Sequence, residues 1–212
     1  MTLLLVTAAC SYLLGSIPFG YLLVRIFSGQ DIRETGSGNI GATNVARSFP
    51  WLGGVTLLLD AGKGSAAVAV SIVLSRVWYS GQSLPASEIA VHAAMAALLA
   101  VLGHMFPIWL KFKGGKGVAT SLGSFVMIAP KAVLVALAAF VVVLLAFRYV
   151  SLSSMSAVAV FPLALWLLND SSGQPVVLGL VSGAAVMVVL MHHENIRRLL
   201  SGTEPQMRWT SA

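Results

Sequence analysis

The chain has 212 residues, of which 58% are hydrophobic and only 9% are charged, and its mean hydropathy is +0.90. These values lie far outside the range of soluble globular proteins and predict a polytopic membrane protein. The net charge of +6 comes from basic residues scattered among the loops without an RNA- or DNA-binding pattern, so we expect no nucleic-acid partner.

Seven apolar runs predict an all-α polytopic bundle that forms a single membrane-embedded domain over residues 1–212. A helix needs about 20 residues to cross a hydrocarbon core about 30 Å thick, so the longer runs can span and the shorter ones predict short or half-length helices. The predicted spans cover residues 3–27, 52–75, 87–104, 117–130, 131–147, 152–168 and 175–191.

The first apolar run is expected to be a retained helix rather than a signal peptide, because it is long enough to span and its first basic residue is Arg25. Cys10 is the only cysteine of the chain, which excludes disulfides within it and metal sites built from several cysteines. We expect Cys10 to be a small core residue.

The basic residues predict the orientation of the bundle. Ten of them fall on one side of the predicted membrane and only Arg76 and Lys131 on the other, while Lys63 lies inside a helix. By the positive-inside rule the first side is cytoplasmic, so the N-terminus is outside and the C-terminus is inside. The ten residues are Arg25, Arg33, Arg47, Lys111, Lys113, Lys116, Arg148, Arg197, Arg198 and Arg208.

This topology places four polar segments on the cytoplasmic face, at residues 36–47, 103–120, 148–154 and 192–198. The charge rule explains their lysines and arginines but not their glycines, asparagines and histidines. We therefore expect the four segments to form one site, with four ordinary solvated loops as the alternative.

The first segment, GSGNIGATNVAR, formally matches the G-x-G-x-x-G dinucleotide fingerprint. That fingerprint requires a preceding strand, and here it follows a predicted membrane helix, so we reject a Rossmann site. Glycines let backbone N–H groups approach an anion, hydroxyl and amide side chains add hydrogen bonds, and an arginine fork suits phosphate. A flexible linker is the alternative. The predicted phosphate ligands are Gly36, Ser37, Gly38, Asn39, Gly41, Thr43, Asn44 and Arg47.

Asp60 and Lys63 lie three residues apart inside the second predicted span. Ionisable residues within a membrane are costly, so they indicate a functional or a mutually paired group. We favour a structural ion pair that supports the first polar segment, with direct substrate contact as the alternative.

The second segment contains FKGGKG, which resembles a P-loop only superficially, because Gly117 stands where a Ser or Thr would bind magnesium. ATP hydrolysis is therefore not expected. A short apolar helix begins near Gly117, and its N-terminal N–H groups and dipole would hold a phosphate together with the lysines. A lysine cluster that only sets topology is the alternative. The predicted phosphate ligands here are His104, Lys113, Gly114, Gly115, Lys116 and Gly117.

In the fourth segment, His192 and Asn195 are three residues apart and share one face of a predicted helix. Histidine can orient or deprotonate a hydroxyl near neutral pH, and asparagine can hold the same substrate; a membrane-boundary feature is the alternative. No third ligand has a suitable spacing, so no metal is expected. Ser151 and Ser154 of the third segment are predicted substrate contacts, and Glu194 is a predicted supporting residue.

The segments GSGNIGATNVAR, GHMFPIWLKFKGGKGVATSLG and HHENIRRLLSGTE together resemble the signature segments of the bacterial acyl-phosphate:glycerol-3-phosphate acyltransferases, an integral-membrane family. The resemblance covers essentially the whole chain, and DAGKG and RYVSLSS agree with it. It implies transfer of a fatty acyl group from acyl phosphate to the 1-hydroxyl of glycerol 3-phosphate. The products would be lysophosphatidic acid and inorganic phosphate, in the first acylation step of bacterial phospholipid synthesis.

With this resemblance, Ser37, Arg47, Lys116, His192 and Asn195 become the predicted catalytic residues. Acyl phosphate is an activated mixed anhydride, so no covalent enzyme intermediate is needed. Either His192 or an acyl-phosphate oxygen takes the hydroxyl proton. We expect no cofactor, no obligate protein partner, surrounding membrane lipid, and a location in the bacterial inner membrane with the site at the cytoplasmic face. A secondary transporter of a phosphorylated or anionic solute is the alternative, disfavoured because the chain has no internal repeat.

Overall fold

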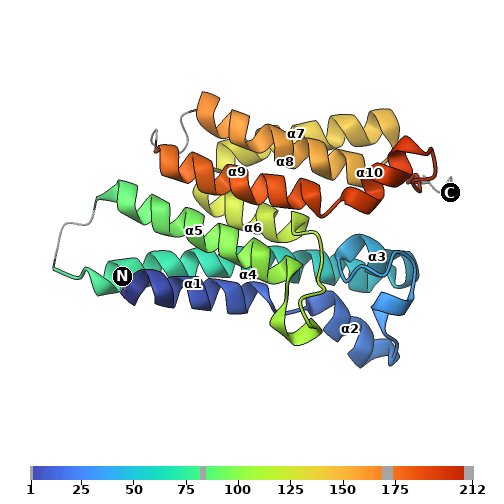
Figure 1. Cartoon of the computed structure of the whole chain (residues 1–212), viewed down its shortest axis with the longest axis horizontal. Coiled ribbons are helices and arrows are strands. Elements are labelled where there is room, and N and C mark those ends of the chain that lie inside the picture. Colours follow the sequence, from blue (N-terminus) through green and yellow to red (C-terminus); the bar gives the residue numbers. More distant parts are fainter. Residues whose placement is uncertain (1, 82–84, 169–173, 208–212) are drawn as a thin grey trace. The chain divides into compact units, whose positions relative to one another are not determined.

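A computed structural model of the chain describes residues 2–81, 85–168 and 174–207, and the regular structure in these ranges is entirely helical (Figure 1). The predicted all-α fold class is confirmed, while the predicted loop residue Arg208 lies outside the described residues. The α-helices are α1 (Thr2–Gly15), α2 (Phe19–Ser28), α3 (Ala42–Ser48), α4 (Pro50–Trp78), α5 (Ala86–Met105), α6 (Val118–Ile128), α7 (Pro130–Phe147), α8 (Val150–Leu167), α9 (Pro175–Leu190) and α10 (His193–Leu200), and the 3-10 turns are η1 (Ile32–Glu34) and η2 (Ile108–Leu110).

Within the described residues, five segments are long and apolar enough to cross a membrane. They are Thr2–Ser28, Pro50–Trp78, Ala86–Leu110, Pro130–Phe147 and Val150–Leu167. Helices α9 and α10 add a sixth span if they count as one segment, although the chain bends by 53° between them. Helix α6 has only 11 residues, which at 1.5 Å per residue gives about 17 Å, so it would cross a hydrocarbon core about 30 Å thick only where the bilayer is locally thinned. The seven-span count therefore stays a prediction.

The predicted first span is divided into two helices rather than being one continuous helix. Helix α1 ends at Gly15, and α2 begins after Pro18, which is its N-cap residue. Proline has no N–H to donate and disfavours helical backbone at the preceding residue, so the helix is interrupted here. The interruption releases the carbonyl oxygen of Ile17 from helical pairing, and this oxygen accepts a hydrogen bond from Lys63 at 2.7 Å.

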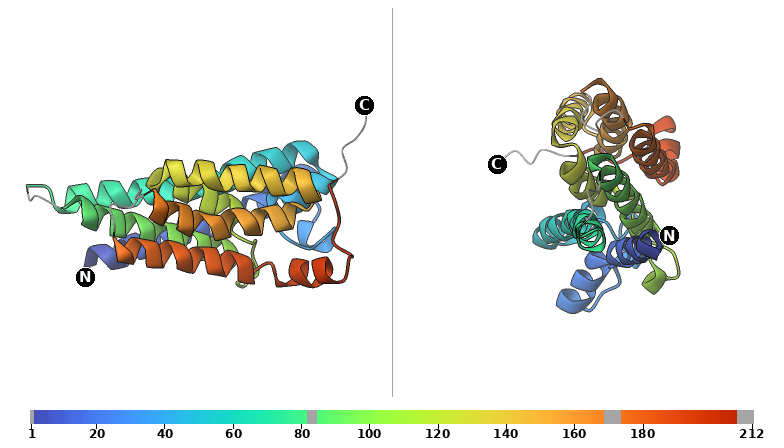
Figure 2. Two further views of the ribbon diagram at one scale, coloured as in Figure 1. Left: turned by 90° about the horizontal axis from the view of Figure 1, so that it is seen from above. Right: turned by 90° about the vertical axis from the view of Figure 1, so that its left-hand side faces the viewer.

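The chain forms two compact units, Met1–Ile128 and Ala129–Ala212. In the first unit, α1, α4 and α5 pack against one another, and α6 packs against α4 and α5 (Figures 1 and 2). Glycines allow these helices to approach closely, because a Cβ at Gly15 would overlap with the backbone of Ala100 and a Cβ at Gly123 with the backbone of Ala61. In the second unit, α8 packs against α7 and α9.

Candidate functional site

The buried side chain of Asn44, on α3, organises the first predicted phosphate loop. Its amide oxygen accepts a hydrogen bond from the backbone N–H of Ser37 at 2.9 Å. Its amide nitrogen donates to three carbonyl oxygens, those of Ile32 at 3.3 Å, Thr35 at 3.0 Å and Asn39 at 2.9 Å. Asn44 was expected to contact phosphate directly, but these bonds give it a role within the loop.

Position 36 must be glycine for two separate reasons. Its φ of +58° lies in the left-handed region, which residues other than glycine rarely adopt. A Cβ at this position would also overlap with the amide oxygen of Asn44. Asn39 completes the turn, because its side-chain oxygen accepts the N–H of Gly41 at 2.8 Å just before α3 begins. The polar side chains that remain exposed on this loop are those of Ser37, Thr43 and Arg47.

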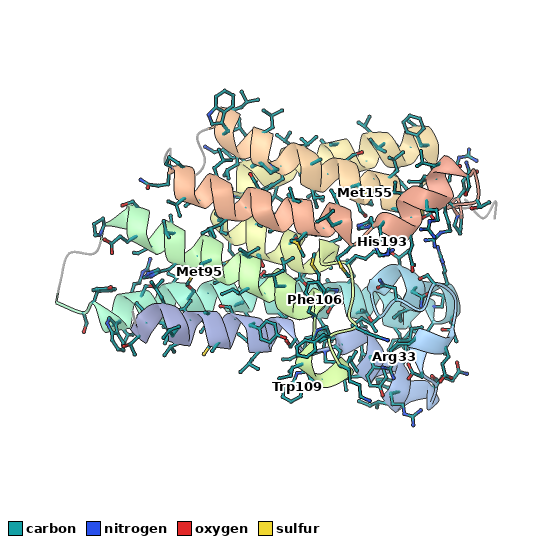
Figure 3. All side chains as sticks on the ribbon, viewed as in Figure 1. Arg33, Met95, Phe106, Trp109, Met155 and His193 are labelled. Atoms are coloured by element: carbon teal, nitrogen blue, oxygen red, sulfur yellow. The ribbon has the colours of Figure 1, made fainter. Side chains whose placement is uncertain are left out.

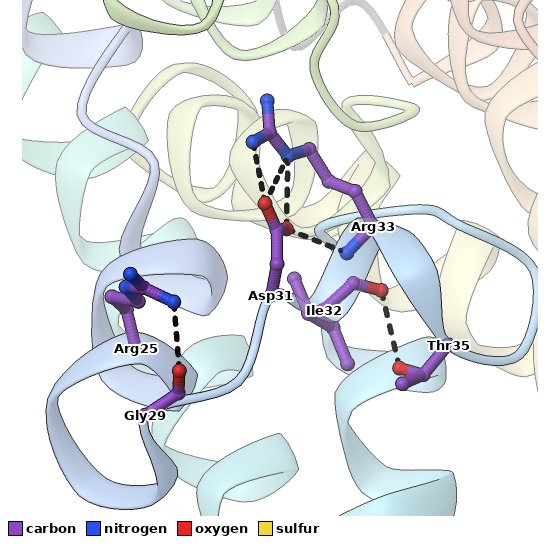
Figure 4. A network of polar contacts seen from close by, with 6 residues as sticks. All are labelled: Arg25, Gly29, Asp31, Ile32, Arg33 and Thr35. Carbon is purple, nitrogen blue, oxygen red and sulfur yellow. Dashed lines mark hydrogen bonds and ion pairs between the residues drawn. The ribbon is translucent and has the colours of Figure 1, made fainter.

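A network of charged residues holds the chain between α2 and this loop (Figure 4). The carboxylate of Asp31 accepts hydrogen bonds from the backbone and the guanidinium of Arg33, and this pairing lowers the pKa of Asp31 to about 2. The Arg33 guanidinium also lies 4.9 Å from the centre of the Tyr21 ring. Arg25 donates to the carbonyl oxygen of Gly29 at 2.7 Å. Arg25 and Arg33 were predicted only to set the topology, and Asp31 was not among the predicted site residues.

The second predicted phosphate segment, residues 111–117, is hereafter the glycine–lysine loop. It follows α5 and a turn that contains Phe106 and Trp109 (Figure 3). The backbone N–H groups of Gly114 and Gly115 donate to the carbonyl oxygens of Met105 and His104, both at 3.0 Å. These two N–H groups therefore hold the loop against the end of α5 instead of pointing at a ligand.

Close packing explains why residues 114 and 115 are glycines. A Cβ at Gly114 would overlap with the carbonyl oxygen of His104 and crowd Pro107. A Cβ at Gly115 would overlap with Nε2 of His104 and lie 2.8 and 2.9 Å from two carbons of that ring. Past this point Gly117 has a φ of +84° and leads into α6, while Lys113 is exposed and Lys116 half-buried.

Asp60, Lys63 and His104 form a buried polar cluster, and the His104 ring contacts the glycine–lysine loop at Gly115. Lys63 Nζ is 2.8 Å from Asp60 Oδ1, and both side chains are 2% exposed. The same carboxylate oxygen is 3.5 Å from Nδ1 of His104, which is also buried. The ion pair expected between Asp60 and Lys63 is present. His104 was expected to bind phosphate but was not expected to face Asp60.

In the second unit, the carboxylate of Glu204 accepts hydrogen bonds from three polar side chains. Its Oε1 accepts hydrogen bonds from the hydroxyl of Ser151 at 2.6 Å and from the amide of Asn195 at 2.7 Å. Its Oε2 accepts one from Nε of Arg198 at 2.7 Å. Burial by itself would raise the pKa of Glu204, but the three hydrogen bonds together lower it. The carboxylate is therefore ionised near neutral pH.

Glu204 rather than Glu194 supports Asn195 in this way. The Glu194 side chain is 65% exposed and reaches Arg198 only at 4.0 Å. Glu204 lies within the segment HHENIRRLLSGTE, but no periodicity links it to Asn195. A backbone bond from the N–H of Met207 to the carbonyl oxygen of Arg148 holds the following chain in place. The hydroxyl of Ser154, a predicted substrate contact, donates to the carbonyl oxygen of Val150 in its own helix.

His192 lies at the bend between α9 and α10 and is the N-cap residue of α10. It is buried, whereas His193 is exposed at the same bend (Figure 3). Nδ1 of His192 is 2.7 Å from the carbonyl oxygen of Val188. Since a carbonyl oxygen can only accept, Nδ1 carries the proton of this bond, and in the neutral ring Nε2 is then the basic nitrogen.

Comparison with known proteins gives consistent results over nearly the whole chain. The model of the family described as glycerol-3-phosphate acyltransferase matches residues 5–202. A glycerol-3-phosphate acyltransferase of Syntrophotalea carbinolica is 41% identical over 98% of this chain and 100% of its own length. One of Sinorhizobium medicae is 45% identical, over 95% of this chain and 92% of the relative.

Two solved structures also match. The crystal structure of PlsY, an integral membrane glycerol 3-phosphate acyltransferase, in its glycerol 3-phosphate form has a TM-score of 0.84 and 34% identity over 97% of this chain and 96% of that one. Its lysophosphatidic acid form has a TM-score of 0.80 and 33% identity, covering 97% and 95% of the two chains. The chain therefore belongs to the glycerol-3-phosphate acyltransferase family and is an integral membrane protein.

Proposed function

We propose that the protein transfers a fatty acyl group from acyl phosphate to the 1-hydroxyl of glycerol 3-phosphate, with lysophosphatidic acid and inorganic phosphate as products. The likeness to PlsY in its glycerol 3-phosphate form, at 34% identity over 97% of the chain, carries this proposal. The likeness to the lysophosphatidic acid form supports the product. The acyl-phosphate donor rests on the sequence resemblance.

The reaction needs little from the protein beyond anion binding and orientation. The hydroxyl oxygen of glycerol 3-phosphate attacks the acyl carbonyl carbon, the bond from that carbon to the phosphate oxygen breaks, and inorganic phosphate leaves. The hydroxyl proton passes to Nε2 of His192 or to an oxygen of the leaving phosphate. Both substrates carry phosphate, so preorganised cationic and hydrogen-bonding groups are the main catalytic requirement.

We assign the phosphate contacts of the first loop to Ser37, Thr43 and Arg47, because these side chains are exposed on a turn that Asn44 and its glycines hold rigid. In the glycine–lysine loop we assign them to Lys113 and Lys116, together with the N-terminus of α6. An arginine fork suits a phosphate, and lysine supplies a compact charge.

In the second unit, we assign orientation of the acceptor hydroxyl to His192 and Asn195. Both side chains are buried, and both are fixed by neighbours, His192 by Val188 and Asn195 by Glu204. Ser151 shares the Glu204 carboxylate with Asn195, so we assign it, like Glu204, to holding this group in place.

The same proposal includes the topology expected from the sequence. It has seven spans, with α6 as a short helix, an outer N-terminus, a cytoplasmic C-terminus and the site at the cytoplasmic face of the bacterial inner membrane. We also propose that both compact units belong to one acyltransferase domain, which is supported by a family match that runs through both, from residue 5 to 202.

Purified protein in detergent or lipid vesicles, supplied with acyl phosphate and glycerol 3-phosphate, should form lysophosphatidic acid. Arg47→Ala and Asn195→Ala should abolish the transfer in folded protein. Arg76→Ala and His193→Ala are matched controls that should retain activity, because we place neither residue in the site. Flux of a phosphorylated solute into vesicles without acyl transfer would instead show a transporter, and near-normal activity in both site variants would refute their assignment.

A further inference from the structure

We propose that Asp60 and His104 are positioning residues for the glycine–lysine loop: Asp60 holds the His104 ring, and the ring sets the backbone at Gly115. The inference rests on the proposed function in taking this loop to hold a substrate phosphate. It goes beyond that function in naming two buried side chains that act on the loop from behind.

The first step is the anchoring of Asp60. Its carboxylate is paired with Lys63 at 2.8 Å, and Lys63 in turn donates to the carbonyl oxygen of Ile17, which the break between α1 and α2 has released. The Lys63 ammonium also lies 5.7 Å from the centre of the Phe19 ring. These contacts tie the carboxylate to α4 and to the start of α2, so it is a fixed reference point.

The second step is the contact between Asp60 and His104, in which a carboxylate oxygen and Nδ1 of the ring are 3.5 Å apart. The ring is buried at the end of α5, and Nδ1 faces the carboxylate. A ring that is held on this edge has its opposite edge directed with equal precision, as with metal-binding histidines whose orientation is set by a carboxylate partner.

The third step is the contact between that opposite edge and the loop. Nε2 and its neighbouring ring carbons occupy the space into which a side chain at Gly115 would extend. The carbonyl oxygen of the same residue, His104, accepts the N–H of Gly115 at 3.0 Å. The ring and backbone of one residue thus fix one side of the loop, immediately before Lys116 and the start of α6.

A purely structural purpose would not require such groups. Buried ion pairs are often replaceable by apolar residues without loss of stability, and ionisable side chains are expensive within a membrane segment. Geometry that must be held within a fraction of an ångström for a phosphate provides a reason to keep them.

A double-mutant cycle tests the contact between ring and loop. Gly115→Ala should raise the KM of a phosphate-bearing substrate by about tenfold, with a smaller effect on kcat, because the new Cβ displaces the loop from the ring. His104→Ala opens that space, so in His104→Ala/Gly115→Ala the second change should add less than about threefold. Asp60→Asn should shift the same KM, and it should add little to His104→Ala.

Gly114→Ala is the matched control. Its Cβ would meet the carbonyl oxygens of His104 and Met105 and the ring of Pro107, which remain in His104→Ala. The Gly114→Ala defect should therefore persist at full size in that background. If Gly115→Ala behaves like Gly114→Ala, so that both add fully to His104→Ala, the proposed positioning contact is wrong.

Folding is checked for every variant by size-exclusion chromatography in detergent. If His104→Ala does not fold, His104→Asn takes its place, because it lacks the Nε2 edge but keeps a polar atom toward Asp60. Failure of both to fold would overturn the proposal in favour of a purely structural role. Absence of transfer by the wild-type protein would refute the proposed function, whereas an active wild type with an additive cycle would refute only the positioning role.

Discussion

Asn44→Asp should destabilise the protein more than Asn44→Ala, although aspartate is nearly the same size as asparagine. The asparagine amide has two N–H groups and one acceptor in use, so Asn44→Ala removes roughly three hydrogen bonds at about 1 kcal/mol each, or about 3 kcal/mol in total. In Asn44→Asp a carboxylate oxygen faces the carbonyl oxygens of Ile32, Thr35 and Asn39. Repulsion and the burial of a charge add about 1–3 kcal/mol to the loss.

Guanidinium unfolding of the purified protein in detergent micelles, followed by tryptophan fluorescence, would measure these differences in the free energy of unfolding. Asn39→Ala is the control within the same loop, because the Asn39 side chain accepts a single hydrogen bond, from Gly41, so about 1 kcal/mol is expected. A variant Asn44→Asp as stable as Asn44→Ala, or an Asn44→Ala no more costly than Asn39→Ala, would refute the role of Asn44 in shaping the loop.

Three further outcomes are expected. Glu204→Gln should have a lower free energy of unfolding than wild type near neutral pH, and this difference should become smaller in acid. The pKa of Glu204 is lowered by folding, so the ionised carboxylate stabilises the fold above its ordinary pKa of 4.5. This contribution is lost as the pH falls through the folded-state pKa. Unfolding titrations at neutral and acidic pH measure this difference, and a difference independent of pH would contradict the reasoning. Gly36→Ala should lower the free energy of unfolding by about 1–2 kcal/mol because of the left-handed φ, and by more because the new Cβ overlaps with Asn44. Gly29→Ala is the control, because Gly29 has a similar φ but no described atom within 4 Å of its Cβ position. Equal losses in the two variants would contradict the overlap. Lys63→Met should cost about 3–5 kcal/mol by leaving a buried carboxylate without its closest partner; thermal unfolding should show most of this recovered on adding Asp60→Asn, and no recovery would contradict the pairing.

Some of the residue roles could be predicted from local sequence and others could not. The pairing of Asp60 with Lys63 follows from their spacing on one helix, because residues three apart share a face. The contact of Ser151 with Glu204 spans 53 positions in sequence, and no periodicity indicates it. Glu194 was the predicted supporting residue in this segment, and Glu204 was not among the predicted site residues.

The glycines of the two polar loops also show how far local sequence predicts a role. Their abundance predicted that the backbone approaches a bound phosphate closely. At Gly115 the group approached is the His104 ring of the protein itself, and the N–H of Gly115 is bonded to the His104 carbonyl oxygen. A glycine-rich segment indicates that side chains would not fit there, but only the folded chain shows which group lies where those side chains would extend.

Apolar run length and polar loop motifs are local properties, so they are enough to identify a helical membrane protein of one recognisable family. The folded chain shows which polar side chains are bound within the protein: Asn44 bonds to its own loop, Asn195 and Ser151 bond to Glu204, and the His104 ring fills the space beside Gly115. It also brings Lys63 to the carbonyl oxygen of Ile17, which the break at Pro18 releases. Two of these contacts, Ser151 with Glu204 and Lys63 with Ile17, join residues 53 and 46 positions apart. The others cross loops and do not follow the periodicity of a helix, so all of them exist only once the chain has folded.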